Sequence, residues 1–169
     1  NLTINYSSIG DSLIHSWVRG LSSTGSETSN SIALDINGNI YTTGFFHGTL
    51  DFDPGVGVFN LTSNGLSDVF VLKLDGNGNF LWAKNVGSIG ADLGEGISID
   101  PNGNVFVTGY FTNTVDFDPG AGVVNLTSNG NSDIFVLKLD ANGNFVWARN
   151  IGGTSSDIGY SIVNDASGN

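Results

Sequence analysis

The chain contains no cysteine and no methionine, and only three of its 169 residues are proline. Without cysteine there can be no disulfide, no thiolate zinc site and no thiol nucleophile. No apolar run approaches the roughly 20 residues of a membrane-spanning helix. The first residues also lack the charged and apolar regions of a signal peptide. Because methionine is absent, we expect the chain to be a processed product or a piece of something longer.

Basic residues are also scarce, with 5 against 16 acidic residues and a formal net charge of -11. This charge repels the phosphate backbone that supplies most nucleic-acid affinity, so we expect no nucleic-acid partner and no membrane insertion. The acidic residues are spread along the chain, which favours a role in solubility over an interaction tail. A hydrophobic share of 39% is enough for a packed core.

What the chain does have is an internal repeat of about 65 residues. Asp51 to Gly55 recurs as Asp116 to Gly120, and residues 31–95 align without a gap on residues 96–160 with roughly 40 of 65 positions identical. Such regularity is typical of stacked structural units. The repeat also contains a tryptophan and two basic positions, occupied by Trp17, Trp82 and Trp147; by Arg19, Lys84 and Arg149; and by Lys73 and Lys138.

Each repeat predicts four strands in two hairpins. Residues 32–35 and 39–46 are β-rich runs separated by an Asn-Gly turn, and residues 68–75 and 79–86 form a second such pair. The run from Val69 to Leu72 is apolar on both alternating faces, which is typical of a sheet covered on both sides. Residues 49–67 and 114–132 lie between the hairpins, where we expect a long ordered loop or a small extra hairpin.

The prediction is therefore an all-β fold of β-propeller blades, each a four-stranded antiparallel sheet from one repeat. A linear β-solenoid or filament and a β-sandwich are the alternatives. We expect residues 1–30 to hold the end of one blade and a connection, residues 31–95 and 96–160 one blade each, and residues 161–169 the first strand and turn of the next. Closed propellers usually need four to eight blades. The segment is then incomplete, either as a fragment, which we favour, or completed by copies of itself.

One acidic pattern raises the possibility of a metal. Asp51 and Asp53, repeated as Asp116 and Asp118, lie two residues apart before Pro-Gly, so both carboxylates of a pair would project to one side of an extended segment. Oxygen ligands in this arrangement could bind Ca²⁺ with carbonyl oxygens from the turn. The favoured alternative is an Asx-type turn in which these carboxylates cap backbone amides.

The remaining candidate side chains favour structural roles. The Asp-x-Asn-Gly-Asn stretches at Asp35, Asp75, Asp100 and Asp140 predict tight hairpins, not EF-hand loops. Glu27, Asp92 and Asp157 could line a channel, but backbone capping between blades is favoured. His15 and His47 occupy unrelated repeat positions, so neither metal nor triad chemistry is predicted. The three tryptophans are expected to fill the layer between blades, with carbohydrate stacking as the alternative.

The repeat resembles a known family, the bacterial β-propeller repeat abbreviated SBBP. The resemblance rests on residues 96–109, on residues 132–140 and on the ending from Trp147 to Gly152. It implies a propeller in a secreted or surface-exposed bacterial protein, without implying an enzyme activity.

Together these observations predict a non-enzymatic extracellular or cell-surface module with a structural or adhesive role. It would bind protein or glycan through its loops. One alternative is self-association of repeats into a ring or filament, and another is a propeller enzyme whose site lies elsewhere. No catalytic residue and no cofactor other than the possible calcium is predicted.

Overall fold

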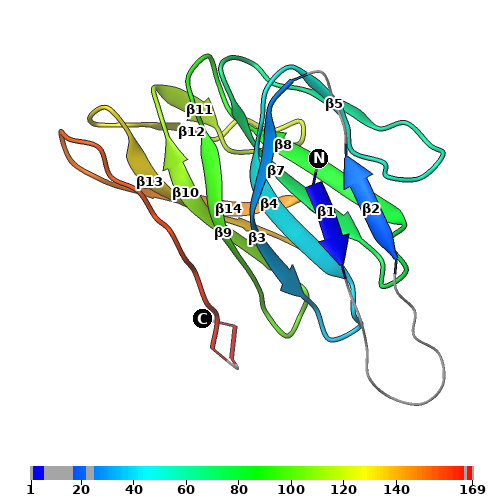
Figure 1. Ribbon diagram of the computed structural model, residues 1–169. Coiled ribbons are helices and arrows are strands. Elements are labelled where there is room, and N and C mark those ends of the chain that lie inside the picture. Colours follow the sequence, from blue (N-terminus) through cyan, green and yellow to red (C-terminus); the bar gives the residue numbers. More distant parts are fainter. Residues whose placement is uncertain (1, 6–16, 22–24, 166, 169) are drawn as a thin grey trace.

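The computed structural model describes residues 2–5, 17–21, 25–165 and 167–168. Every regular element in these residues is a β-strand, which confirms the all-β prediction (Figure 1). The larger strands form two four-stranded antiparallel sheets, in which spatial order follows chain order. The sheets do not close into a ring, so the structure is an incomplete set of propeller blades.

We call the two sheets blade 1 and blade 2. Blade 1 consists of β3 (Glu27–Leu34), β4 (Ile40–Phe46), β7 (Asp68–Leu74) and β8 (Phe80–Val86). Blade 2 consists of β9 (Leu93–Ile99), β10 (Val105–Phe111), β13 (Asp133–Leu139) and β14 (Phe145–Ile151). A separate pair, β1 (Leu2–Asn5) and β2 (Val18–Leu21), precedes them. The first strands begin at Glu27 and Leu93, both of which lie a few residues before the expected unit boundaries of 31 and 96.

Residues 49–67 and 114–132 each contain a small extra hairpin. The sequence had predicted either such a hairpin or a long ordered loop. The hairpins are β5 (Thr49–Asp51) with β6 (Asn60–Thr62), and β11 (Thr114–Asp116) with β12 (Asn125–Thr127). Residues 161–169 were expected to hold the first strand and turn of a further blade, but the described residues 158–165 pair with no strand of the described chain. A turn follows them, in which Gly168 N donates to Asp165 O at 3.0 Å.

The Asp-x-Asn-Gly-Asn stretches form the tight hairpin turns that the sequence predicts. In the first, Asp35 Oδ1 accepts hydrogen bonds from Asn37 N and Asn39 N, both at 2.9 Å. Gly38 adopts a φ of 78°, a left-handed conformation that glycine reaches without a Cβ penalty. The same contacts recur at Asp75, Asp100 and Asp140. One carboxylate thus holds each turn closed.

The first strand of each blade contains a β-bulge. In blade 1 the pairing steps from Ser29↔Gly44 to Ser31↔Thr43, and in blade 2 it shifts at the matching place, between Gly94 and Gly96. Asn30 and Glu95 are therefore the extra residues. A Cβ at Gly44 would collide with the Thr28 carbonyl oxygen. The bulge brings this carbonyl over the neighbouring strand, which explains why glycine stands there in both repeats.

The two blades pack face to face, and β9 lies against β3 and β4. Strand β7 is buried along its whole length, because blade 2 covers one of its faces and Leu21 of β2 with the first small hairpin covers the other. This confirms the expectation drawn from the run Val69 to Leu72. The core between the blades contains Tyr41, Val71, Ile97 and Leu137. A second cluster around Phe46, Phe52 and Phe70 lies on the other side of blade 1.

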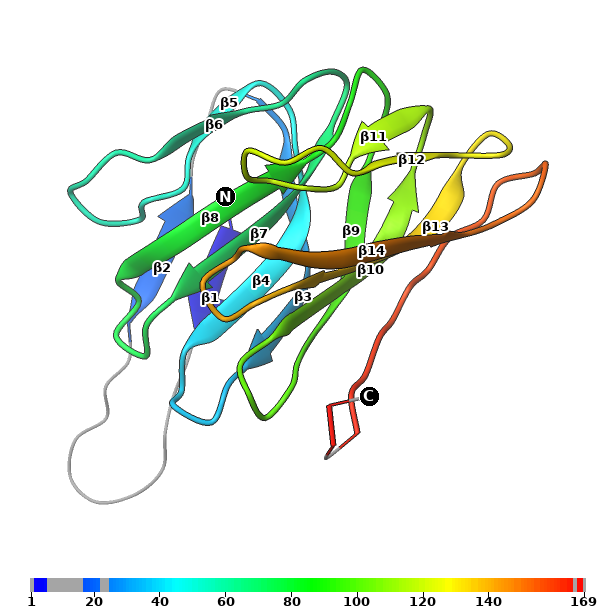
Figure 2. The same ribbon diagram turned by 180° about the vertical axis from the view of Figure 1, so that it is seen from behind.

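The segment has four surfaces: an inner edge, an outer edge, a loop face and a turn face. The inner edge is formed by β3, β9 and the run 158–164, which lie side by side in Figure 1, and the outer edge by β8 and β14, seen in Figure 2. The loop face contains the small hairpins and the connections between blades. The turn face, at the opposite end of the strands, contains the Asp-x-Asn-Gly-Asn turns.

Candidate functional site

The paired aspartates of the loop face cap backbone amides. Asp51 Oδ1 accepts from Asp53 N at 3.0 Å and from Phe59 N at 2.7 Å, and Asp53 Oδ1 accepts from Gly55 N at 2.7 Å. Asp116 and Asp118 repeat these contacts at 3.1, 2.8 and 2.7 Å. The geometry is that of the Asx-type turn, the favoured alternative.

The calcium site predicted at Asp51, Asp53, Asp116 and Asp118 stays a prediction. In the part of the chain that the structure describes, no three His, Cys, Asp or Glu side chains come together in a metal-binding arrangement. The second oxygen of each of these carboxylates has no hydrogen bond from the described residues. A calcium ion bound there would therefore draw most of its six to eight oxygens from backbone and water.

A buried aspartate in each repeat, Asp68 or Asp133, holds loop-face residues through hydrogen bonds. Asp68 is fully buried, and it accepts hydrogen bonds from Asn64 N at 3.1 Å and from Asn85 Nδ2 at 3.1 Å. Asp133 takes the same position in blade 2. Its buried Oδ1 has no hydrogen-bond partner among the described residues and packs against Gly152. Burial raises the pKa of Asp68.

Asp92 links the blades. Its Oδ2 accepts from Ser88 N of the connection at 2.7 Å, and its Oδ1 accepts from Thr112 N of blade 2 at 2.9 Å. Asp157 caps Gly153 N in the same way at 2.9 Å. Backbone capping by this acidic series is therefore confirmed at these two positions. Burial raises the pKa of Asp92 to about 6, and the nearby Asp68 adds to this effect.

Two of the three tryptophans, Trp17 and Trp82, fill contacts between blades, as predicted. Trp17 Nε1 donates to Gly76 O at 3.2 Å, and Trp82 Nε1 donates to Ala141 O at 3.3 Å. Each indole ring also packs against the glycine of the turn that supplies this carbonyl, Gly78 for Trp17 and Gly143 for Trp82. Two successive junctions therefore use the same contact.

Two of the basic residues, Lys73 and Arg19, also join blades. Lys73 Nζ donates to Ala141 O at 3.1 Å and lies 4.9 Å from the centre of the Tyr41 ring. Arg19 Nε donates to Gly78 O at 3.4 Å across the preceding junction. Lys73, Tyr41, Asp35 and Asp100 line a cavity of about 150 Å³ at the turn face. Because the lining comes from both blades and Lys73 crosses between them, the cavity belongs to the junction.

Blade 2 has one uncovered surface, which we call the tail face: Phe106, Ile134, Val136, Lys138, Trp147 and Ile151. Its strand β13 alternates between buried and half-buried residues where β7 is buried throughout. Ile151 is 60% exposed, whereas the matching Val86 is 4% exposed under blade 2. An open cavity of about 390 Å³ lies beside Phe106, Lys138 and Trp147. The tail face is thus the open counterpart of a filled junction.

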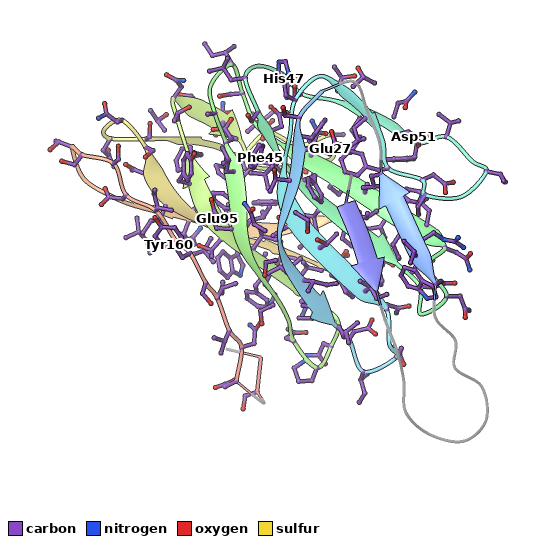
Figure 3. All side chains as sticks on the ribbon, viewed as in Figure 1. Glu27, Phe45, His47, Asp51, Glu95 and Tyr160 are labelled. Carbon is purple, nitrogen blue, oxygen red and sulfur yellow. The ribbon has the colours of Figure 1, made fainter. Side chains whose placement is uncertain are left out.

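The sequence reasoning missed the bulge position of the first strand. Asn30, Glu95 and Tyr160 occupy it in successive repeats, and Figure 3 places Glu95 beside Tyr160 on the inner edge. The sequence signal that could have revealed this position is that three different residues occupy it in otherwise similar repeats. His47 lies on the loop face (Figure 3). His15 lies outside the described residues.

No helix in the described residues could cross a membrane.

The model of the SBBP β-propeller repeat family matches the chain at residues 16–44 and 81–117. These segments run through the tryptophan positions and the first strands of both blades. The match agrees with the resemblance drawn from the sequence and with the four-stranded blades.

Two curated proteins are similar to parts of the chain. An uncharacterised WD repeat-containing protein of Acanthamoeba polyphaga mimivirus is 32% identical over 103 residues, which cover 53% of this chain and 7% of that protein. The regulatory protein FlaEY of Caulobacter vibrioides is 28% identical over 104 residues, covering 62% of this chain and 11% of that protein. The chain thus spans a small part of the length of these relatives.

Proposed function

Because the chain contains repeats of the SBBP β-propeller family, we propose that it is a non-enzymatic interaction module of an extracellular or cell-surface protein. It binds a protein or glycan partner through the loop face. Propeller and WD repeats commonly act through protein contacts, which supports this role. The proposal concerns this segment, since its relatives are much longer proteins.

The loop-face hairpins provide the observation on which the proposal depends. Their carboxylates are engaged in holding the backbone, so the loops are ordered before any partner arrives. Val56 and Val58 are 107% and 72% exposed at the tip of the first hairpin. The matching residues of the second hairpin are Ala121 and Val123, so the two tips differ at the first of these positions and agree at the second. Preorganised loops that differ at their tips suit selective binding.

The test is a binding screen of the 169-residue chain on immobilised glycans and extracellular proteins. Val56→Ser with Val58→Ser is expected to weaken any binding at least tenfold. Ile36→Ser is the matched control, because Ile36 is 92% exposed on the turn face. Equal binding by the loop variant and the wild type would overturn the proposal.

A second candidate function is assembly through the tail face. Trp147 repeats the position of Trp82, but no turn of a further blade lies against it among the described residues. Within the same residues, Lys138 makes no hydrogen bond to a carbonyl oxygen like that of Lys73. Another blade of the same kind, from a second copy, would supply both contacts. Analytical ultracentrifugation tests this: Ile151→Lys is expected to abolish concentration-dependent association, and a strictly monomeric wild-type chain would exclude it.

A further inference from the structure

The bulge residue of blade 1 makes a contact that its counterpart in blade 2 is chemically unable to make. Asn30 Nδ2 donates a hydrogen bond to Gly94 O of blade 2 at 2.9 Å. This bond crosses the junction at the inner edge. Glu95 takes the same place in blade 2, and an ionised carboxylate accepts hydrogen bonds only. It cannot donate to the equivalent carbonyl.

That equivalent carbonyl belongs to Gly159, which follows Gly94 by one repeat. Gly94 packs against Thr43 and Val69 of blade 1, and Gly159 packs against the matching Thr108 and Ile134 of blade 2. Gly159 N donates to Gly109 O at 3.3 Å, which holds this run on the blade. In blade 2 the Glu95 carboxylate and the Gly159 carbonyl are therefore both hydrogen-bond acceptors. The matching pair at the blade 1 position consists of a donor and an acceptor.

Aromatic side chains lie beside this pair of acceptors. Tyr110 is half-buried and close enough to Glu95 to feel its charge. Tyr160 is 70% exposed at the next bulge position, beside Glu95 in Figure 3. Burial raises the pKa of the Tyr110 phenol, and the Glu95 and Asp92 carboxylates raise it further. Burial also raises the pKa of Glu95. Glu95 makes no hydrogen bond or ion pair with the residues that the structure describes.

A cationic hydrogen-bond donor would complement the two acceptors, the Glu95 carboxylate and the Gly159 carbonyl. A calcium ion needs six to eight oxygen ligands, whereas the place offers one carboxylate and one carbonyl, with the Asp92 oxygens engaged by amides. An arginine or lysine side chain needs fewer acceptors, and its charge is attracted to aromatic rings. Bulges re-aim single side chains in this way beside binding sites.

We propose that Glu95, with the Gly159 carbonyl and the rings of Tyr110 and Tyr160, binds an arginine or lysine side chain of a protein partner at the inner edge. This inference rests on the proposed function as an interaction module and names the chemistry of one contact. The net charge of -11 favours approach of a basic partner.

The test is a titration of the ¹⁵N-labelled full chain with Nα-acetyl-arginine amide, followed by amide shifts in NMR spectra. Saturable shifts are expected at Glu95, Tyr110 and Gly159. Nα-acetyl-citrulline amide, which has the same shape without the charge, is expected to bind at least fivefold more weakly. Calcium chloride serves as the second probe and is expected to shift none of these amides.

Three variants isolate the contact. Glu95→Gln is expected to weaken arginine binding at least fivefold, and Glu95→Asn to abolish it while restoring the bridge that Asn30 makes. Asp75→Asn makes the same change in net charge on the turn face and is expected to bind like the wild type. The spectra themselves show whether each variant is folded.

Wild-type shifts in Glu95→Gln, shifts confined to other residues, or an equal response to citrulline would overturn the inference. The loop-face proposal is judged separately by the Val56→Ser, Val58→Ser variant. Partner binding that depends on the loops but not on Glu95, with no arginine response, would reject this inference alone.

Discussion

Replacement of Trp82 and of Trp147 by alanine, one at a time, measures how strongly neighbouring blades hold each other. The two tryptophans have nearly the same contacts inside their own blades. Trp82 meets the Tyr41 ring at 6.1 Å and 71°, and Trp147 meets the Phe106 ring at 6.1 Å and 72°. Only Trp82 also contacts a following blade, through Ala141 O and Gly143.

The difference between the two variants should equal the contribution of the junction. The Trp82 hydrogen bond contributes about 0.5–1.5 kcal/mol to stability. Packing of the ring on the Gly143 turn adds about 1–1.5 kcal/mol if roughly 50 Å² of apolar surface is covered. We expect Trp82→Ala to lower the free energy of unfolding by about 3–5 kcal/mol, and Trp147→Ala by about 1.5–3 kcal/mol less.

Urea unfolding followed by far-UV circular dichroism gives both values by linear extrapolation. Trp82→Phe and Trp147→Phe form a milder pair that keeps an aromatic ring and removes only the N–H donor and part of the ring. Equal losses for Trp82→Ala and Trp147→Ala, within about 0.5 kcal/mol, would refute the reasoning. The blades would then be stabilised by their own sheets alone.

Three further variants test the local arguments. Gly109→Ala places a Cβ against the Leu93 carbonyl oxygen and is expected to cost about 2–3 kcal/mol in urea unfolding, whereas Gly153→Ala, with nothing within 4 Å, is expected to be neutral; equal stability of the two would contradict the bulge geometry. Burial raises the pKa of Asp92 to about 6, so the folded chain takes up a proton before the unfolded chain as pH falls. The wild type should therefore gain on the order of 1 kcal/mol between pH 7 and pH 5 relative to Asp92→Asn, and parallel pH profiles would show otherwise. Asp51→Ala frees two amides and is expected to cost about 1 kcal/mol, while Asp51→Asn keeps an acceptor and costs less; a calcium-dependent rise in the unfolding temperature that both variants remove would instead support the metal site.

Much of the fold could be predicted because the repeat encodes it locally. The Asp35 turn depends on hydrogen bonds to residues two and four positions away, together with one glycine of positive φ. Such contacts depend on residues that are close in the sequence. The turns, the four strands and the extra hairpin could therefore be predicted from the sequence. The apolar run Val69 to Leu72 likewise indicated a sheet covered on both faces.

The bulge at Glu95 depended on the tertiary structure. Its place is set by the register between β9 and β10, and its lack of a partner becomes visible only beside the Asn30 bridge of the other blade. The contact between Trp82 and Ala141 joins residues 59 positions apart. The exposure of Ile151 depends on whether a further sheet lies against blade 2.

The repeat, the blade and its turns follow from the order of the amino acids, because their hydrogen bonds connect residues close along the chain. Which surfaces are filled and which are open follows from the three-dimensional arrangement instead, because packing between sheets depends on the relative placement of whole blades. A side chain such as Glu95 or Trp147 therefore gains its role from what lies opposite it in space.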